Sequence, residues 1–201
     1  MSNQLQNQNV NARVNSFNGK WDDQTCFNWE MSHGINLESV QFENMYKNTA
    51  DTINRLISFE TVSDLGGGVG AYSRALKRLG KTVNYYDANA HHLYYAQGYN
   101  VAHKYTLGDF STKPIEADLV VCIEVMEHMT DDSIKRTLDN CKCNYFHFSS
   151  TPHTNKMDED WGHINIKQEN EWIELFKQHG FNLKSKVSVP TQWSLLYEKA
   201  H

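Results

Sequence analysis

The sequence lacks the features that define several protein classes. Its four cysteines make neither a disulfide framework nor a paired C-x-x-C zinc site. No apolar run approaches the length that spans a membrane, and the Asn/Gln-rich N-terminus lacks the basic and then apolar layout of a signal peptide. These absences predict reduced thiols and a cytoplasmic protein without a membrane partner.

Positive charge is also scarce. Nineteen Lys and Arg residues stand against 24 Asp and Glu residues, which gives a formal net charge of −5 and a pI near 6.0. A general polyanion-binding surface needs an excess of basic residues, so nucleic acid is disfavoured as a substrate. The length of 201 residues suits one domain with a full core and an N-terminal attachment.

Glycine, in contrast, is concentrated in one stretch. Residues 62–76 have the pattern of a short strand, a glycine turn and a helix, with glycine at positions 66, 67, 68 and 70. Glycine alone adopts positive φ without steric cost, so the backbone of such a turn can lie flat against a ligand. The following helix directs its free N–H groups to the same place, where a carboxylate or phosphate can bind. This pattern alone also fits dinucleotide-binding proteins.

The segments around the turn alternate between strand-like and helix-like patterns. We expect strands over 61–65, 82–87, 101–107, 118–123 and 144–150, and helices over 70–79, 89–97, 130–139 and 167–179. Such alternation predicts an α/β fold, a doubly wound sheet with helices on both faces. The last two strand-like runs, 181–189 and 193–199, are joined by three residues and should pair antiparallel.

The chain divides into three expected segments. Residues 1–20 are rich in Asn and Gln and predict a disordered tail. Residues 21–59 predict a helical cap, with an aromatic stretch followed by a helix from about 37 to 59, and residues 60–201 form the main domain. The cap either packs simply on the sheet or covers an acceptor pocket as a lid, with Trp29 or Phe27 facing the substrate.

Two motifs together resemble class I S-adenosylmethionine-dependent methyltransferases. In the first, Asp64 precedes the alternating glycines and Asp87 ends the next strand. In the second, an apolar strand runs into E-V-x-E-H over residues 124–128, followed by methionine. The resemblance covers about residues 60–200. It implies a Rossmann-like seven-stranded sheet with an antiparallel C-terminal hairpin, and S-adenosylmethionine as the cofactor.

The resemblance also implies roles for single residues. Asp87 would accept hydrogen bonds from both ribose hydroxyls, Asp109 and Phe110 would contact adenine, and Glu124 would lie near the methionine part of the donor. The expected cofactor-binding residues are Asp64, Gly66, Gly67, Gly68, Gly70, Asp87, Ala88, Asp109, Phe110 and Glu124. Ligands of open α/β sheets bind beyond the carboxyl ends of the strands, where the acidic members of this set fall.

The expected reaction places few demands on the protein. Methyl transfer from a sulfonium is an in-line displacement, so the protein mainly positions the two reactants and excludes water. A hydroxyl or neutral amine acceptor must also lose a proton, for which histidine is the usual base near pH 7. We expect His128 and His163 as catalytic residues, with His153 as a third candidate. The predicted function is methyl transfer to an oxygen or nitrogen of a small-molecule acceptor.

Three alternatives stay open at this point. Residues Glu124, Glu127, His128 and His163 resemble the divalent-metal site of small-RNA 2′-O-methyltransferases. The same motif also occurs in metal-free relatives, and we expect no metal. The chain could instead be a non-catalytic S-adenosylmethionine-binding protein, or a nicotinamide-dependent oxidoreductase that binds NAD. The sequence has no D/N/S-P-P-aromatic motif and no Pro-Cys pair, which disfavours amino methylation of DNA and methylation of cytosine C5.

Overall fold

A seven-stranded sheet forms the centre of the protein. The computed structural model describes residues 21–200, so the tail expected over 1–20 lies outside the described residues. The strand order is β3-β2-β1-β5-β7-β9-β8. The bounds are β1 (Thr61–Leu65), β2 (Thr82–Asp87), β3 (Lys104–Leu107), β5 (Leu119–Ile123), β7 (Tyr145–Ser149), β8 (Phe181–Lys186) and β9 (Leu195–Lys199). Strand β9 pairs antiparallel with both β7 and β8, which confirms the expected terminal hairpin.

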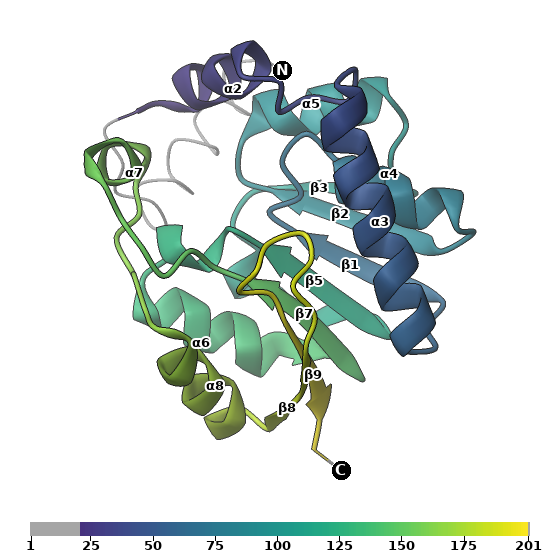
Figure 1. Ribbon diagram of the computed structural model, residues 1–201, viewed down its shortest axis with the longest axis vertical. Helices are drawn as coiled ribbons and strands as arrows, with labels where there is room; N and C mark the ends of the chain where they lie inside the picture. Colours follow the sequence, from purple (N-terminus) through teal and green to yellow (C-terminus); the bar gives the residue numbers. More distant parts are fainter. Residues whose placement is uncertain (1–20, 201) are drawn as a thin grey trace.

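Helices cover both faces of this sheet, as expected (Figure 1). One face carries α3 (Val40–Leu56), α4 (Ala71–Arg78) and α5 (Ala90–Gly98), and the other carries α6 (Asp131–Asn140) and α8 (Glu169–Gln178). Successive side chains of a strand point to opposite faces. Thus Leu119 and Val121 belong to the core under α3 to α5, whereas Val120 and Cys122 belong to the core under α6 and α8.

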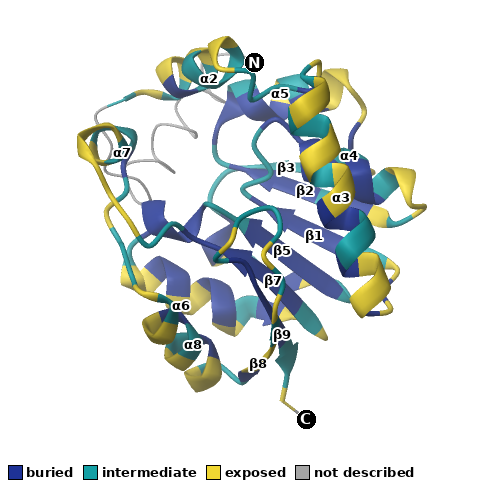
Figure 2. Cartoon of the chain, viewed as in Figure 1, coloured by how far each residue is buried: buried dark blue, intermediate teal, exposed yellow. Residues whose placement is uncertain are grey.

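Burial follows this two-layer arrangement. Figure 2 shows the central strands buried along most of their length and the outer faces of the helices exposed. Trp172 and Phe176 of α8 are almost fully buried and pack on Phe148 of β7, with ring centroids 4.8 and 4.9 Å from that ring. Full burial of such side chains contributes roughly 1.5–3 kcal/mol each.

Two helices were not predicted. Helix α2 (Asp23–Ser32) forms where only an aromatic stretch was expected, and α7 (Lys156–Trp161) forms between the strand expected to end at 150 and the helix expected to begin at 167. The apolar residues of α2 are not concentrated on one face, and no residue of α7 is buried, so neither segment has the pattern of a packed helix. The sequence features that indicate these two helices are their N-cap residues. Asp22 accepts from the Thr25 N–H at 2.7 Å, and Asn155 forms a capping box with α7.

Other differences concern the ends of elements. Helix α3 begins at Val40 after its N-cap Ser39, not at 37, and β3 begins at Lys104, not at 101. Two short strands outside the main sheet, β4 (Ile115–Glu116) and β6 (Cys141–Lys142), pair parallel with each other. All four cysteines are free and buried, as reduced thiols require. None of the described helices combines the length and apolar content that a membrane crossing needs.

A buried histidine joins three elements near the middle of the sheet. His147 of β7 is fully buried. Its Nε2 donates to the Val189 carbonyl at 2.9 Å, which leaves Nδ1 to accept the Tyr72 hydroxyl of α4 at 2.8 Å. Burial lowers the pKa of His147 to about 4. The imidazole is therefore neutral in the folded protein at pH 7.

This histidine predicts acid sensitivity. As pH falls below about 6.5, the unfolded chain binds a proton at residue 147 that the folded chain does not bind, so the unfolding free energy decreases until pH reaches the folded pKa. Between about pH 7.5 and about pH 5 the loss is about 2 kcal/mol. His147→Gln should lose that part of the pH dependence in urea unfolding, whereas the variant of the exposed His153, His153→Gln, should keep it. Parallel pH profiles for His147→Gln and the parent protein would contradict this account.

Candidate functional site

A cavity of about 400 Å³ opens at the carboxyl ends of β1, β2 and β5. The strand order reverses between β1 and β5, because the chain moves outward to β2 and β3 and then returns to the other side of β1. Open α/β sheets bind their ligands at this position. The cavity is also lined by residues of α2, α3 and α7 and of the loop between β8 and β9.

The glycine turn forms one wall of the cavity. Gly68 has φ of +54°, and a Cβ built on it meets nothing within 4 Å. Its N–H donates to the Asp87 carboxylate at 2.8 Å. A Cβ on Gly67, in contrast, would lie 2.4 Å from the Tyr85 ring. Open space beside Gly68 therefore leaves the backbone accessible to a ligand from the cavity side.

Gly70 has a different position from the other glycines. It is the N-cap of α4 with φ of +84°, and a Cβ there would lie 2.6 Å from Val101 in the core. Gly70 is not among the residues that line the cavity. Its small size permits the close approach of α4 to Val101, so the structure gives it a packing role.

Asp87, at the end of β2, lies in the cavity wall as a well-bonded carboxylate. It accepts from the backbone N–H groups of Gly68 and Asn89, the latter at 2.7 Å, and from the Tyr85 hydroxyl at 3.2 Å. Burial alone would raise the pKa of Asp87, but His92 and the two N–H groups together hold it below its usual value. The side chain is therefore charged near neutral pH.

His92 connects this carboxylate to helix α2. Its Nδ1 lies 3.7 Å from Asp87 Oδ2, and its Nε2 contacts the Glu30 carboxylate. Burial would lower the pKa of His92, yet the two carboxylates raise it well above its usual value. The resulting chain of charges was not predicted, because Glu30 lies 62 residues from His92 and nothing in the local pattern pairs them.

Glu124 reaches the cavity through a strained backbone. It follows β5 with φ of +55°, a conformation that costs a non-glycine residue of order 1–3 kcal/mol and is concentrated at functional sites. Its Oε1 accepts from the Trp193 indole N–H at 2.8 Å and from the Ser149 hydroxyl. The loop before β9 thus holds the carboxylate at the cavity.

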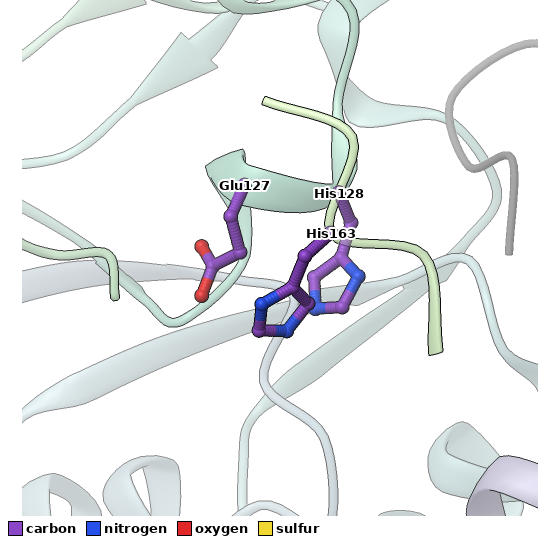
Figure 3. Close-up of side chains that lie close together, drawn as sticks. All are labelled: Glu127, His128 and His163. Carbon is purple, nitrogen blue, oxygen red and sulfur yellow. The ribbon is translucent and has the colours of Figure 1, made fainter. Parts of the chain in front are cut away.

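A second cluster lies one turn further along the chain. Glu127 and His128 are in the 3-10 turn η2 (Met126–His128), and His163 follows α7. Backbone N–H groups of residues 164 and 165 donate to the Glu127 carbonyl at 2.9 Å, which brings His163 to this turn. One ligand atom from each of the three side chains lies within 4.8 Å of the others (Figure 3).

The protonation of this cluster follows from its burial. Glu127 is fully buried, and neither carboxyl oxygen has a hydrogen-bond partner among the described residues. Burial raises the pKa of Glu127 well above its usual value, and the nearby Glu124 raises it further. Burial lowers the pKa of His163, although Asp158 opposes this. The His163 imidazole is therefore suited to accept a proton near pH 7.

Aromatic side chains of α2 and α7 meet at the rim of the cavity. The Trp161 ring lies 4.8 Å from that of Trp29 and 6.0 Å from that of Trp21. Trp161 lines the cavity, but Trp29 stacks on His33 at 4.0 Å and Phe27 packs on His92 at 5.6 Å. Trp29 and Phe27, of which one was expected to face the substrate, are not among the lining residues, whereas Trp161 is.

The structure brings most of the predicted site residues together. Those that line the cavity are Asp64, Gly66, Gly67, Gly68, Asp87, Ala88, Phe110, Glu124, His128 and His163. Gly70 and Asp109 do not line it. Asp109 instead caps a 3-10 turn, where its Oδ1 accepts from the Ser111 N–H at 2.8 Å. His153 is exposed and is also absent from the lining.

Comparison with known proteins identifies the type of domain that this chain resembles. Residues 63–142 match the model of a family described as a methyltransferase domain. Comparison with curated protein sequences gives no match. Among solved structures, the chain is similar to magnesium protoporphyrin IX methyltransferase (ChlM) from Synechocystis PCC 6803 with bound SAH. The TM-score is 0.58 at 16% identity, over 88% of this chain and 98% of that one.

Two further structures show the same fold. The SAH-bound form of CalO1, a methyltransferase in calicheamicin biosynthesis, has a TM-score of 0.56 at 21% identity, over 82% of this chain and 55% of that one. The pyocyanin biosynthetic protein PhzM has a TM-score of 0.57 at 16% identity, over 81% and 56%. The chain therefore spans little more than half the length of these two proteins. At such identities the likeness shows the α/β fold.

The glycine turn gives a direct test of the cavity wall. Gly67→Ala should destabilise the fold by about 1–3 kcal/mol, because its Cβ meets the Tyr85 ring. Gly68→Ala should cost about 1 kcal/mol, the price of a left-handed alanine alone. Urea unfolding of the two variants beside the parent protein measures both values. A Gly68→Ala variant that is the less stable of the two would contradict the open space described beside Gly68.

Proposed function

We propose that this protein transfers a methyl group to an oxygen or nitrogen of a small molecule, because residues 63–142 match the model of a methyltransferase domain and the chain has the fold of S-adenosylmethionine-dependent methyltransferases. A domain of this type uses S-adenosylmethionine as its methyl donor. The observation that carries the proposal is that the glycine turn, Asp87, Glu124 and His163 all line one cavity.

The residues of this wall fit the donor. The open space beside Gly68 is a cradle that any side chain would fill. Asp87, a charged acceptor at the end of β2, suits a pair of ribose hydroxyls. The apolar side chain of Phe110 lies in the same wall, where it would cover a base, and Asp64 and Glu124 would face the cationic methionine part. When bound, the donor supplies an electrophilic methyl group on a sulfonium.

The part of the cavity at His128 and His163 would bind the acceptor. His163 carries an imidazole that is neutral near pH 7 and would take a proton from a hydroxyl or amine acceptor. His128 packs against it with ring centroids 4.5 Å apart and would fix its orientation. Helices α2 and α7, which meet through Trp29 and Trp161, would close the cavity and exclude water.

Calorimetric titration with S-adenosylmethionine, S-adenosylhomocysteine and NAD tests the donor assignment. We expect both sulfur ligands to bind and NAD not to bind. Asp87→Asn should weaken S-adenosylhomocysteine binding by roughly tenfold to a hundredfold, because it removes charge-assisted hydrogen bonds. Asp132→Asn, on the exposed start of α6, should leave it unchanged. Binding of NAD alone would indicate an oxidoreductase, and donor binding without transfer to any acceptor would indicate a binding protein.

A second candidate, a metal-dependent methyltransferase similar to the small-RNA 2′-O enzymes, is favoured by the cluster of Glu127, His128 and His163. Their ligand atoms lie close enough to share one ion, and the two Glu127 oxygens lack donors. Such an ion would gather acceptor hydroxyls at the cavity. Mixed carboxylate and imidazole ligation does not select one divalent metal. The formal net charge of −5 disfavours RNA as the acceptor of such an enzyme.

Titration with Mn²⁺ and Co²⁺ in the absence of donor tests this candidate. If the cluster is a metal site, each ion should bind with one site per chain, and Glu127→Gln and His163→Gln should each reduce affinity by about tenfold or more. His153→Gln, which alters an exposed histidine outside the cavity, is the matched control. Absence of binding heat, or equal metal affinity in Glu127→Gln and the parent protein, would exclude a metal-dependent methyltransferase that uses this cluster.

A further inference from the structure

The charge of the cavity is strongly one-sided. Its lining includes seven carboxyl side chains, from Asp23, Glu30, Asp64, Asp87, Glu124, Glu127 and Asp158. No lysine or arginine is among the described residues that line it. The basic groups present are three histidines, of which His92 is already held between two carboxylates. An anionic ligand would therefore find no lysine or arginine among these described residues, and the charge of His92 is already paired with Asp87 and Glu30.

Most of these carboxyl groups already have donors within the protein. Asp64 accepts from the Ser73 hydroxyl at 2.6 Å, Asp87 from two backbone N–H groups, and Glu124 from the Trp193 indole. Glu127 differs from them. It is 0% exposed, it lines the cavity, and neither of its oxygens has a hydrogen-bond partner among the described residues. Buried polar atoms without a partner are rare, so these oxygens indicate a ligand that forms hydrogen bonds with them. An amine can do so in either protonation state of Glu127, because its N–H groups donate and its lone pair accepts.

On the basis of the methyltransferase function proposed above, we propose that the acceptor is an amine that carries no carboxylate or phosphate group. An amine supplies N–H donors to the Glu127 oxygens. A carboxylate or a phosphate adds negative charge to a cavity in which no described lining residue is a lysine or arginine. A neutral alcohol can donate only one hydrogen bond, so it cannot donate to both Glu127 oxygens at once.

The charge balance of the reaction favours the same class. The lone pair of a neutral amine nitrogen forms the new N–C bond while the C–S bond breaks, and the bonding electron pair remains on sulfur. The positive charge thus moves from sulfur to nitrogen, and the product is a methylated ammonium. A wall of carboxyl groups suits a centre that is cationic before and after transfer. The ammonium can then lose a proton to water.

The remaining lining describes the body of the acceptor. Helix α3 contributes Phe42, Met45 and Tyr46, and α7 contributes Trp161. These side chains provide apolar and aromatic surface in the cavity lining. Aromatic faces also attract cations within about 6 Å of the ring. We therefore expect an amine attached to an apolar or aromatic group.

Matched probes with one ring and one chain length test this proposal. The protein is first saturated with S-adenosylhomocysteine, and the binding of 2-phenylethylamine, 2-phenylethanol and 3-phenylpropionate is then measured by calorimetry with a chelator present. We expect the amine to bind at least about tenfold more tightly than the carboxylate. Glu127→Gln should reduce that preference to about threefold or less, with S-adenosylhomocysteine affinity retained, whereas Asp132→Asn should keep the preference.

The other outcomes of this experiment distinguish failure of the amine assignment from failure of the proposed function. If 3-phenylpropionate binds as tightly as the amine, or if no probe binds to the saturated protein, the amine assignment is overturned while the donor assignment stands. If amine binding requires added Mn²⁺ in place of the chelator, the Glu127 oxygens bind a metal and not the amine. If S-adenosylhomocysteine itself does not bind, the proposed methyltransferase function fails, and the amine assignment fails with it.

Discussion

Burial of carboxyl groups at the ends of β1, β2 and β5 is the constraint on which the rest of the site depends. A buried carboxylate is costly unless donors or cations compensate it. Asp87 is compensated by backbone N–H groups and by His92, and Glu124 by Trp193 and Ser149. These partners come from the glycine turn, α5, β7 and the last loop. Each of these carboxyl groups therefore requires that a different part of the chain be held in place beside it.

The connection from Asp87 outward shows how far this effect extends. His92 remains charged because it lies between Asp87 and Glu30, and Glu30 belongs to α2. The position of α2 is thus coupled to a charge in the cavity wall. Trp29 of α2 meets Trp161 of α7 edge to face, and the chain continues from the C-terminal end of α7 to His163. A continuous set of contacts through α2 and α7 thus links Asp87 to the segment that carries His163.

The parts predicted from sequence are those with strong local signals. Alternation of strands and helices, the glycine turn and the terminal hairpin all depend on periodicity and turn residues within a few positions. These signals placed Asp64, Asp87 and Glu124 at the correct edge of the sheet. Helices α2 and α7 were missed because they cover a cavity and do not bury an apolar stripe. The pairing of Glu30 with His92 and the contact of Trp193 with Glu124 join distant segments, which no local pattern reports.

The turn after β5 carries the clearest conflict between stability and ligand binding. Two residues separate Glu124 from Glu127, both side chains line the cavity, and the chain turns there through a left-handed Glu124. That turn costs backbone strain, brings two carboxyl groups together and leaves the oxygens of one of them without donors. A glycine at position 124 would relieve the strain, and an apolar residue at 127 would relieve the unpaired burial. Places where local rules are broken at a cost to stability are usually functional sites. We therefore propose this turn as the place where the protein meets the reacting part of its ligand, and a hydrogen-bonding group or a cation is the partner that would complete it.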